Sequence, residues 1–188
     1  MRHDGYTGIE NYAAIGDGRT VALIAADGRI DWLPVPNLDT RPVFAALLDA
    51  DEGGYIALHP VGDFSAERSY LEGTNVLVTT FTTDTGVARM TDSLNTGVAG
   101  RLPWTELARR VEGVSGTVEM EWAVVPGTCL GNASPWAYDT VHGTVLRVDG
   151  ITLGVRTLNA DDVDKDTRSI RGRFTTTAGS RSTVAVVG

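Results

Sequence analysis

Apolar and polar residues alternate along much of the chain with the period of two that is typical of β-strands. The clearest example is Val118–Val124, where every second residue is apolar and Glu119 and Glu121 stand between them, which predicts a strand with one buried and one wet face. Similar patterns predict further strands at Tyr55–His59, Asn75–Thr82, Val87–Leu94, Glu106–Glu112, Thr144–Val148, Ile151–Arg156, Ser169–Thr176 and Ser182–Val187. An Asp149-Gly150 pair is expected to join two of them as a hairpin. We therefore predict a single all-β domain over residues 1–188, an antiparallel β-sandwich.

A hairpin near the N-terminus can be worked out in more detail. Asp27-Gly28 is a preferred pair for a two-residue type I′ turn, because both central residues of that turn need positive φ. This turn would place Ala25 opposite Ile30 and Leu23 opposite Trp32. The sequence thus predicts a specific pairing register for these two strands.

Asp31 is the one charged residue on its face of this hairpin, since its neighbours on that face are apolar. If the hairpin is covered on both sides, the carboxylate is buried and requires a partner to remain ionised. Arg19 and Arg29 are the nearest candidates in the sequence. We therefore expect one of these arginines to pair with Asp31.

Only residues 41–48 are expected to form a helix. Thr40 can cap this segment, and Pro42 would lie in the first turn, where its missing N–H does no harm. Phe44 and the Leu-Leu pair at the end of the segment have the spacing of one buried helical face. A short helix at one edge or end of the sandwich is the prediction.

Composition and charge exclude several classes of function. The formal net charge is −8 and no cluster of Lys or Arg occurs, which argues against a nucleic-acid partner. Cys129 is the single cysteine, so an internal disulfide and a zinc site built on several thiolates are both excluded. No apolar run resembles a signal peptide or a membrane span. We expect a cytoplasmic protein with no membrane partner.

Three short motifs suggest chemistry at first sight. Gly16-Asp17-Gly18 lacks the Gly-Lys-Ser/Thr of a phosphate loop and is interpreted as a tight turn. Asp162–Asp166 begins like a calcium loop, but Thr167 and Arg173 replace the required glycine and glutamate, so a solvated acidic turn is expected. No metal-binding spacing relates the three histidines, His3, His59 and His142. We expect no metal, no cofactor and no catalytic residue.

The four tryptophans fall into two groups. Trp32 and Trp122 occupy strand positions that fit a core, whereas Trp104 and Trp136 each follow a proline, which indicates loops. A loop tryptophan can stack on a sugar ring, or it can pack locally, as most aromatic side chains do. Both interpretations remain open for this pair.

Four segments have a recognisable family likeness. They are Ile9–Thr20 with its Ile-Gly-Asp-Gly-Arg-Thr end, Asp27–Pro36 with Asp-Gly-Arg-Ile-Asp-Trp-Leu-Pro, Phe44–Leu48, and Leu107–Gly116. In order and spacing they resemble the opening of bacterial and archaeal glycoside hydrolase family 15 proteins, the glucoamylase-like and trehalase-like enzymes. The similarity extends weakly over nearly the whole chain.

The resemblance implies an N-terminal β-supersandwich that precedes an (α/α)6 barrel with two catalytic glutamates. No helical repeat occurs in these 188 residues, so neither glutamate can be assigned here and the fragment is expected to be inactive. Because the sequence stops inside or just after a strand, we expect it to be cut from a longer protein. Its expected role is to pack against the barrel of an enzyme acting on α-glucosides, trehalose or α-1,4-glucans, and to help close the substrate pocket.

The resemblance has departures that bear on the site. Gly18 and Pro34 stand where the family often has cysteine, and Asn37 stands where it often has arginine. If this loop lines the pocket, Asp39 is the retained candidate for contacting substrate and Asn37 an altered one. Equally open is that Asp39 only caps the following helix.

Two alternatives come from other classes of function. A carbohydrate-binding sandwich would hold glucans by itself through Trp104 or Trp136, and an interaction sandwich would have no link to sugar. The predicted substrate-binding residues are therefore Asn37, Asp39 and Trp136, with the barrel of the same polypeptide as partner.

Overall fold

The computed structural model describes residues 2–96, 102–141, 143–160 and 162–188, so His142 lies outside the described part. In these ranges, one 3-10 turn, η1 (Ile9–Asn11), precedes a series of strands. The strands are β1 (Ala13–Gly16), β2 (Val21–Ile24), β3 (Ile30–Pro34), β4 (Pro42–Phe44), β5 (Gly54–Pro60), β6 (Ser65–Tyr70), β7 (Leu77–Thr82), β8 (Gly86–Leu94), β9 (Glu106–Pro126), β10 (Trp136–Thr140), β11 (Gly143–Val148), β12 (Ile151–Leu158), β13 (Asp162–Lys165), β14 (Ile170–Thr177) and β15 (Arg181–Val187).

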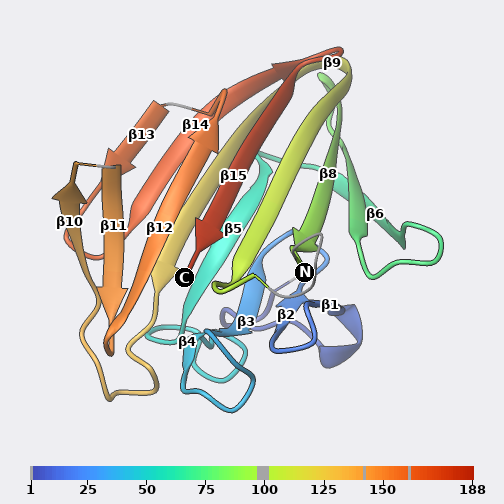
Figure 1. Cartoon of the computed structure of the whole chain (residues 1–188). Helices are drawn as coiled ribbons and strands as arrows, with labels where there is room; N and C mark the ends of the chain where they lie inside the picture. Colours follow the sequence, from blue (N-terminus) through green and yellow to red (C-terminus); the bar gives the residue numbers. More distant parts are fainter. Residues whose placement is uncertain (1, 97–101, 142, 161) are drawn as a thin grey trace.

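The strands form two layers that share β9 (Figure 1). One layer has the order β1-β2-β3-β5-β9-β14-β13, with β4 added beside β3. The other layer has the order β6-β7-β8-β9-β15-β12-β11-β10. Every pairing in both layers is antiparallel, which confirms the predicted antiparallel sandwich.

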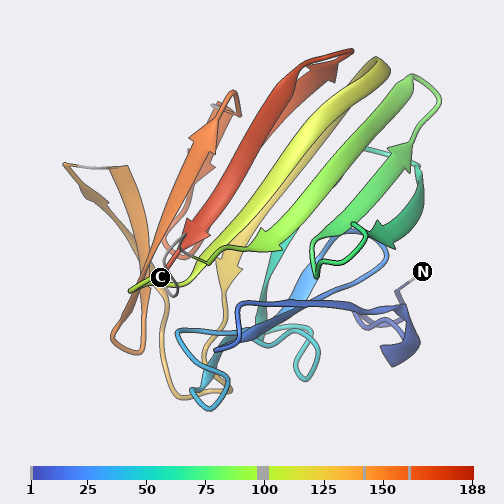
Figure 2. The ribbon, with the colours of Figure 1, turned by 45° about the vertical axis from the view of Figure 1, so that its right-hand side comes forward.

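Strand β9 is 21 residues long and passes from one layer into the other (Figures 1 and 2). Its first half pairs with β8 and β15, and its second half pairs with β5 and β14. The change occurs at a bulge, where the partners of β8 skip Val114, and at Gly116, which has φ +64°. A Cβ on Gly116 would lie 2.2 Å from the carbonyl oxygen of Thr85. The two strands expected at Glu106–Glu112 and Val118–Val124 are therefore one bent strand.

The core lies between the layers. Val118, Met120, Trp122 and Val124 are all buried, whereas Glu119 is exposed, which confirms the alternation predicted for this segment. Large side chains from β7 and β8, such as Phe81 and Met90, lie in the same core cluster. Among the described residues, no helix is long and apolar enough to cross a membrane.

The hairpin between β2 and β3 differs from its prediction. The Ala25 N–H donates to the carbonyl of Arg29 at 2.8 Å, and Gly28, with φ +83°, closes a three-residue connection. Leu23 faces Trp32 as predicted, but Ile24, not Ala25, pairs with Ile30. The type I′ turn was wrong because only the glycine takes positive φ. Asp27 instead accepts the Arg29 N–H on its own carboxylate at 3.1 Å.

The second Asp-Gly pair behaves as predicted. Val148 pairs directly with Ile151, which leaves Asp149 and Gly150 as a two-residue loop. Both have positive φ, 47° and 81°, as a type I′ turn requires. The hairpin between β11 and β12 is confirmed.

The helix predicted for residues 41–48 does not exist. Residues 42–44 form β4 against β3, and the next N–H groups bond elsewhere, Ala45 to the Gly53 carbonyl and Leu47 to that of Asp31. The Thr40 hydroxyl, expected as a helix cap, donates to the carbonyls of Val35 and Asn37. A helix this short forms few hydrogen bonds to offset the free-energy cost of nucleation, whereas the strand buries three successive residues.

The acidic run Asp162–Asp166 was also misjudged in part. Its first four residues form the edge strand β13, because they pair with β14 from Asp162 opposite Arg173 to Lys165 opposite Ile170. The Gly16-Asp17-Gly18 segment is a tight turn as predicted, and Asp17 accepts the N–H groups of Arg19 and Thr20.

Candidate functional site

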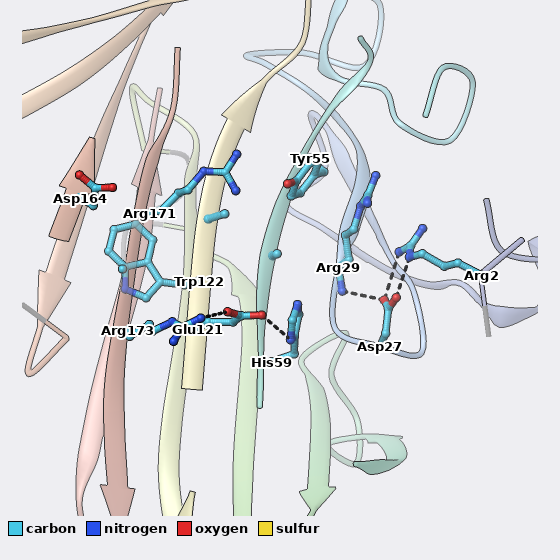
Figure 3. Close-up of a pocket in the computed structure, with 13 residues that line it drawn as sticks. Arg2, Asp27, Arg29, Tyr55, His59, Glu121, Trp122, Asp164, Arg171 and Arg173 are labelled. Carbon is cyan, nitrogen blue, oxygen red and sulfur yellow. Dashed lines mark hydrogen bonds and ion pairs between the residues drawn. The ribbon is translucent and has the colours of Figure 1, made fainter. Parts of the chain in front are cut away.

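A cleft of about 610 Å³ crosses the outward face of the layer that contains β5, β9 and β14 (Figure 3). In Figure 3, Asp164 and Arg171 lie on one side of the cleft, and Arg2 and Asp27 lie on the other. The lining residues are Arg2, Asp27, Arg29, Tyr55, Ala57, His59, Glu121, Trp122, Ala123, Asp164, Arg171, Gly172 and Arg173. Strands far apart in the sequence therefore contribute to one concave surface.

The floor of the cleft is low because small residues meet there. Ala57 on β5 pairs with Ala123 on β9, and Ala123 pairs in turn with Arg171 on β14. The residues next to the two alanines, such as Leu58 and Trp122, are buried and belong to the core. Since side chains alternate across a sheet, the alanines face outward and leave the hollow between longer neighbours.

One wall is built around Asp31, whose side chain is fully buried. The guanidinium of Arg29 donates to Asp31 at 2.6 Å and that of Arg2 at 2.8 Å, while the Tyr12 hydroxyl donates at 2.7 Å. Arg2 also pairs with Asp27 at 2.6 Å. The predicted partnership of Asp31 with Arg29 is confirmed.

Arg19 is not the partner of Asp31, and Arg2 was missed by the sequence reasoning. Arg19 instead pairs with Asp17 at 3.3 Å and donates to the carbonyl of Trp104 at 2.8 Å. Arg2 reaches Asp31 across 29 positions of sequence, and no local pattern predicts such a contact. The second arginine of the wall is thus supplied by tertiary structure.

These contacts shift proton affinities in the wall. Burial opposes the charge on Asp27, but the hydrogen bond and charge of Arg2 outweigh it, so the pKa of Asp27 lies below its ordinary value. Burial and the hydrogen bond to the Asp31 carboxylate both raise the pKa of Tyr12 far above its ordinary value. Asp27 is therefore ionised and Tyr12 protonated at neutral pH.

The opposite part of the cleft carries a second charged group. Glu121 pairs with Arg173 at 3.2 Å, and His59 lies 3.9 Å from the same carboxylate. In the wall around Asp31, the guanidinium of Arg29 also lies 4.0 Å from the centre of the Tyr55 ring, a cation–π arrangement. Most of the cleft's charges are paired, and the two floor alanines are only 8% and 7% exposed.

The three predicted site residues lie outside this cleft. Asn37 and Asp39 are exposed in the connection between β3 and β4, and the Asn37 carbonyl accepts from Thr40. Asp39 caps no helix, because none follows it. Trp136 begins the edge strand β10, is 48% exposed and stacks on Tyr138 with ring centres 4.8 Å apart. It does not lie in a loop as expected.

Hydrogen bonds of Arg19 connect the Asn37–Asp39 loop to Trp104. The Leu38 N–H donates to the Arg19 carbonyl at 2.9 Å, and the Arg19 guanidinium donates to the Trp104 carbonyl. Leu38 and Trp104 are 58% and 44% exposed. This group, Arg19, Leu38 and Trp104 with Asn37 and Asp39, is called the loop patch below.

Sequence reasoning also missed the buried pair of Asp92 and Arg109. Both side chains are fully buried, with Arg109 Nε donating to Asp92 at 2.8 Å and Nη2 to the Gly28 carbonyl at 2.5 Å. A signal was present, because Arg109 stands between the apolar residues Leu107 and Val111 in period two. Within the described ranges, no group of His, Cys, Asp or Glu is arranged to hold a metal ion.

These features define an all-β sandwich domain with a polar cleft on the outward face of one layer. The chain belongs to the trehalase-like N-terminal domain family, whose model, described as "Trehalase-like, N-terminal", matches residues 2–134. The trehalase-like part of the predicted resemblance is thereby confirmed.

Several curated relatives of the chain are named trehalase. The chain is 32% identical over 155 residues to the trehalase of Thermoplasma volcanium, covering 81% of this chain and 25% of the relative. It is 32% identical over 159 residues to that of Thermoplasma acidophilum, covering 78% and 27%. It is 34% identical over 152 residues to the trehalase of Mycolicibacterium smegmatis, covering 69% of this chain and 22% of the relative. The chain spans about a quarter of the length of these relatives.

Proposed function

We propose that this chain is the non-catalytic N-terminal domain of a cytoplasmic trehalase-like glycosidase. Its substrate is an α-glucoside, trehalose in the first place, with α-1,4-glucans as the glucoamylase-like alternative. The observation that carries the proposal is the family match over residues 2–134, together with relatives named trehalase that are about four times longer. The domain's own work is to pack against the catalytic part and help close its pocket.

The loop patch is the surface we propose for that packing. Exposed apolar side chains rimmed by polar ones are typical of interfaces, and Leu38 and Trp104 are joined through the bonds of Arg19. Asn37 and Asp39 flank Leu38, so packing of this patch would carry both to the interface. From that position they would contribute to the edge of a substrate pocket.

A first experiment tests the absence of catalysis in the chain itself. The purified chain is incubated with trehalose, maltose and maltooligosaccharides, and glucose release is measured. We expect no release above a buffer control. Glucose release that persists through further purification would contradict the assignment.

A second experiment tests packing. This chain replaces the matched segment in the Mycolicibacterium smegmatis trehalase, and trehalose hydrolysis by the chimera is compared with that of the enzyme lacking the segment. We expect activity only in the chimera. Asp39→Ala in the chimera should raise KM or lower kcat, whereas Asp84→Ala, an exposed aspartate in the turn before β8, should not. Equal activity with and without the chain would sink the packing role.

One observation favours a second candidate, a carbohydrate-binding module. Trp136 and Tyr138 form a stacked, solvent-facing aromatic pair on an edge strand, and such a surface can hold a sugar ring. In calorimetric titrations with maltooligosaccharides, this candidate predicts saturable heat that disappears in Trp136→Ala and persists in Trp104→Ala. Heat that is unchanged in Trp136→Ala excludes it.

A further inference from the structure

We propose that the cleft over β5, β9 and β14 binds a neutral polyhydroxylated molecule of about disaccharide size. The cleft shares no residue with the loop patch or with the Trp136–Tyr138 pair. The proposal goes beyond the packing role described above and does not depend on it.

The shape of the cleft suits such a ligand. Its volume, about 610 Å³, lies inside the range of roughly 300–1,000 Å³ that is common for small-molecule sites. The floor holds Ala57, Ala123 and Gly172, none of which carries a side chain beyond Cβ, and the two alanines, 8% and 7% exposed, present only a small apolar surface there. A pyranose ring can lay a C–H face on such a floor while its hydroxyls point to the walls.

The charges of the cleft favour a neutral ligand over an anion. Four arginines and four carboxylates lie in or directly behind the lining, namely Arg2, Arg29, Arg171 and Arg173 with Asp27, Asp31, Glu121 and Asp164. Arg2 and Arg29 are matched by Asp27 and Asp31, and Arg173 is matched by Glu121. An anion would therefore meet no net positive field, whereas hydroxyl groups need none.

Several polar groups of the cleft still have unused hydrogen-bonding capacity. Among the described residues, Arg171 has one hydrogen bond, from Nε to Ser169, so its other N–H groups have no partner there. Arg29 Nη2 also has no partner in those ranges, but it is buried. Within the same ranges, neither the Asp164 carboxylate nor the Tyr55 hydroxyl forms a side-chain hydrogen bond. Donors and acceptors are thus both available around one hollow. A hydroxyl group serves as donor and acceptor at once, which makes a polyol the chemical match.

The experiment titrates the chain with trehalose and with maltose by calorimetry and follows backbone amide shifts by NMR. We expect saturable binding of at least one disaccharide, with shifts centred on Ala57, Ala123 and Gly172. Raising NaCl to 0.5 M should leave the affinity within about twofold, because salt screens charge interactions and a neutral ligand has none.

Two variants locate the site. Ala123→Phe fills the floor and should abolish binding, while Arg171→Ala removes the N–H groups proposed to bind the ligand and should weaken binding about tenfold or more. Arg181→Ala is the matched control and should bind normally, since Arg181 is an exposed arginine of the other layer that pairs with Glu112 at 3.5 Å and lies outside the cleft. Thermal unfolding confirms that each variant is folded. If Ala123→Phe is not folded, Arg171→Ala alone tests the site.

The proposal is overturned if neither disaccharide shows saturable binding to the unmodified chain. It is also overturned if binding survives unchanged in Arg171→Ala, or if Trp136→Ala abolishes it while the cleft variants do not. None of these results bears on the glycosidase chimera, which tests packing through a different surface.

Discussion

Asp31 and Asp92 are both buried carboxylates paired with arginine, yet their surroundings differ. Asp92 has one arginine partner, Arg109, and both side chains are fully buried between the two layers. Asp31 has two arginines and a tyrosine, and Arg2 and Arg29 remain 19% and 17% exposed beside the cleft. One pair is sealed in the core, and the other is a network that reaches the surface.

This difference separates two uses of a buried charge. The Arg109 guanidinium also donates to the Gly28 carbonyl, so it ties the first hairpin to β9 inside the core. Water cannot reach either charge if its partner is lost, so the unpaired buried charge destabilises the folded state. The arginines around Asp31 can turn toward water, and Arg2 keeps Asp27. We expect the first pair to govern stability and the second to shape the cleft.

The largest effect is expected from Arg109→Met. The change leaves Asp92 buried without a counter-charge and should lower the free energy of unfolding by about 3–5 kcal/mol. Urea unfolding followed by circular dichroism measures it. Adding Asp92→Leu to the same chain should recover most of the loss, because an apolar pair needs no counter-charge. If the free energy of unfolding of Arg109→Met alone lay within about 1 kcal/mol of that of the parent, Asp92 would not be shielded from water as proposed.

Asp31→Asn should have a smaller effect, about 1–3 kcal/mol in the same assay. The amide keeps the shape of the carboxylate but cannot accept from Arg2, Arg29 and Tyr12 together, and both arginines are close enough to solvent to find water. Asp27→Asn is the control, because Asp27 is more exposed than Asp31 and should matter less. A loss as large as that of Arg109→Met would erase the distinction between the two sites.

Tyr12→Phe should have the smallest effect, about 1 kcal/mol at neutral pH, because it deletes one hydrogen bond to Asp31. The pKa of Tyr12 is higher in the folded chain than its ordinary value of 10.0, so the folded state keeps this proton longer than the unfolded state does. Its contribution is therefore complete below pH 10.0 and is lost as the pH rises through the raised pKa.

Alkaline titration checks the same residue. Absorbance at the phenolate band should show one of the five tyrosines ionising later than the rest, or only on unfolding, and this late step should vanish in Tyr12→Phe. Tyr6→Phe, which removes a half-exposed tyrosine, should leave the late step in place. A late step that survives in Tyr12→Phe would assign the raised pKa to another residue.

Local patterns predicted those parts of the fold whose energetics are local. The period-two alternation located most of the strands, and Asp149-Gly150 formed its predicted turn between the directly paired residues Val148 and Ile151. The identical pair Asp27-Gly28 did not form this turn, because Gly28 lies close against Leu58 and Phe81 and its carbonyl accepts a hydrogen bond from Arg109. The same dipeptide thus has two structures in two tertiary settings.

The candidate sites show the same limit. Sequence reasoning proposed Asn37, Asp39 and Trp136 from a resemblance and from residue type, and whether they touch sugar is a question for the experiments above. It named no residue of the cleft as a site, because the floor alanines and the arginines of the walls are unremarkable in sequence. Ala57 and Ala123 become a floor only when β5 pairs with β9.

The sequence by itself determined the all-β class, the hairpin at Asp149-Gly150, the need of Asp31 for an arginine and the family likeness of the opening. The first three depend on side-chain period, turn geometry and the cost of burying a charge, all of which act over a few residues. Only the tertiary structure decided that residues 42–44 are a strand, that Arg2 joins Asp31, and that distant strands enclose a cleft. Such features depend on contacts between segments that are separated in the sequence, and local sequence patterns do not show which of these segments will meet.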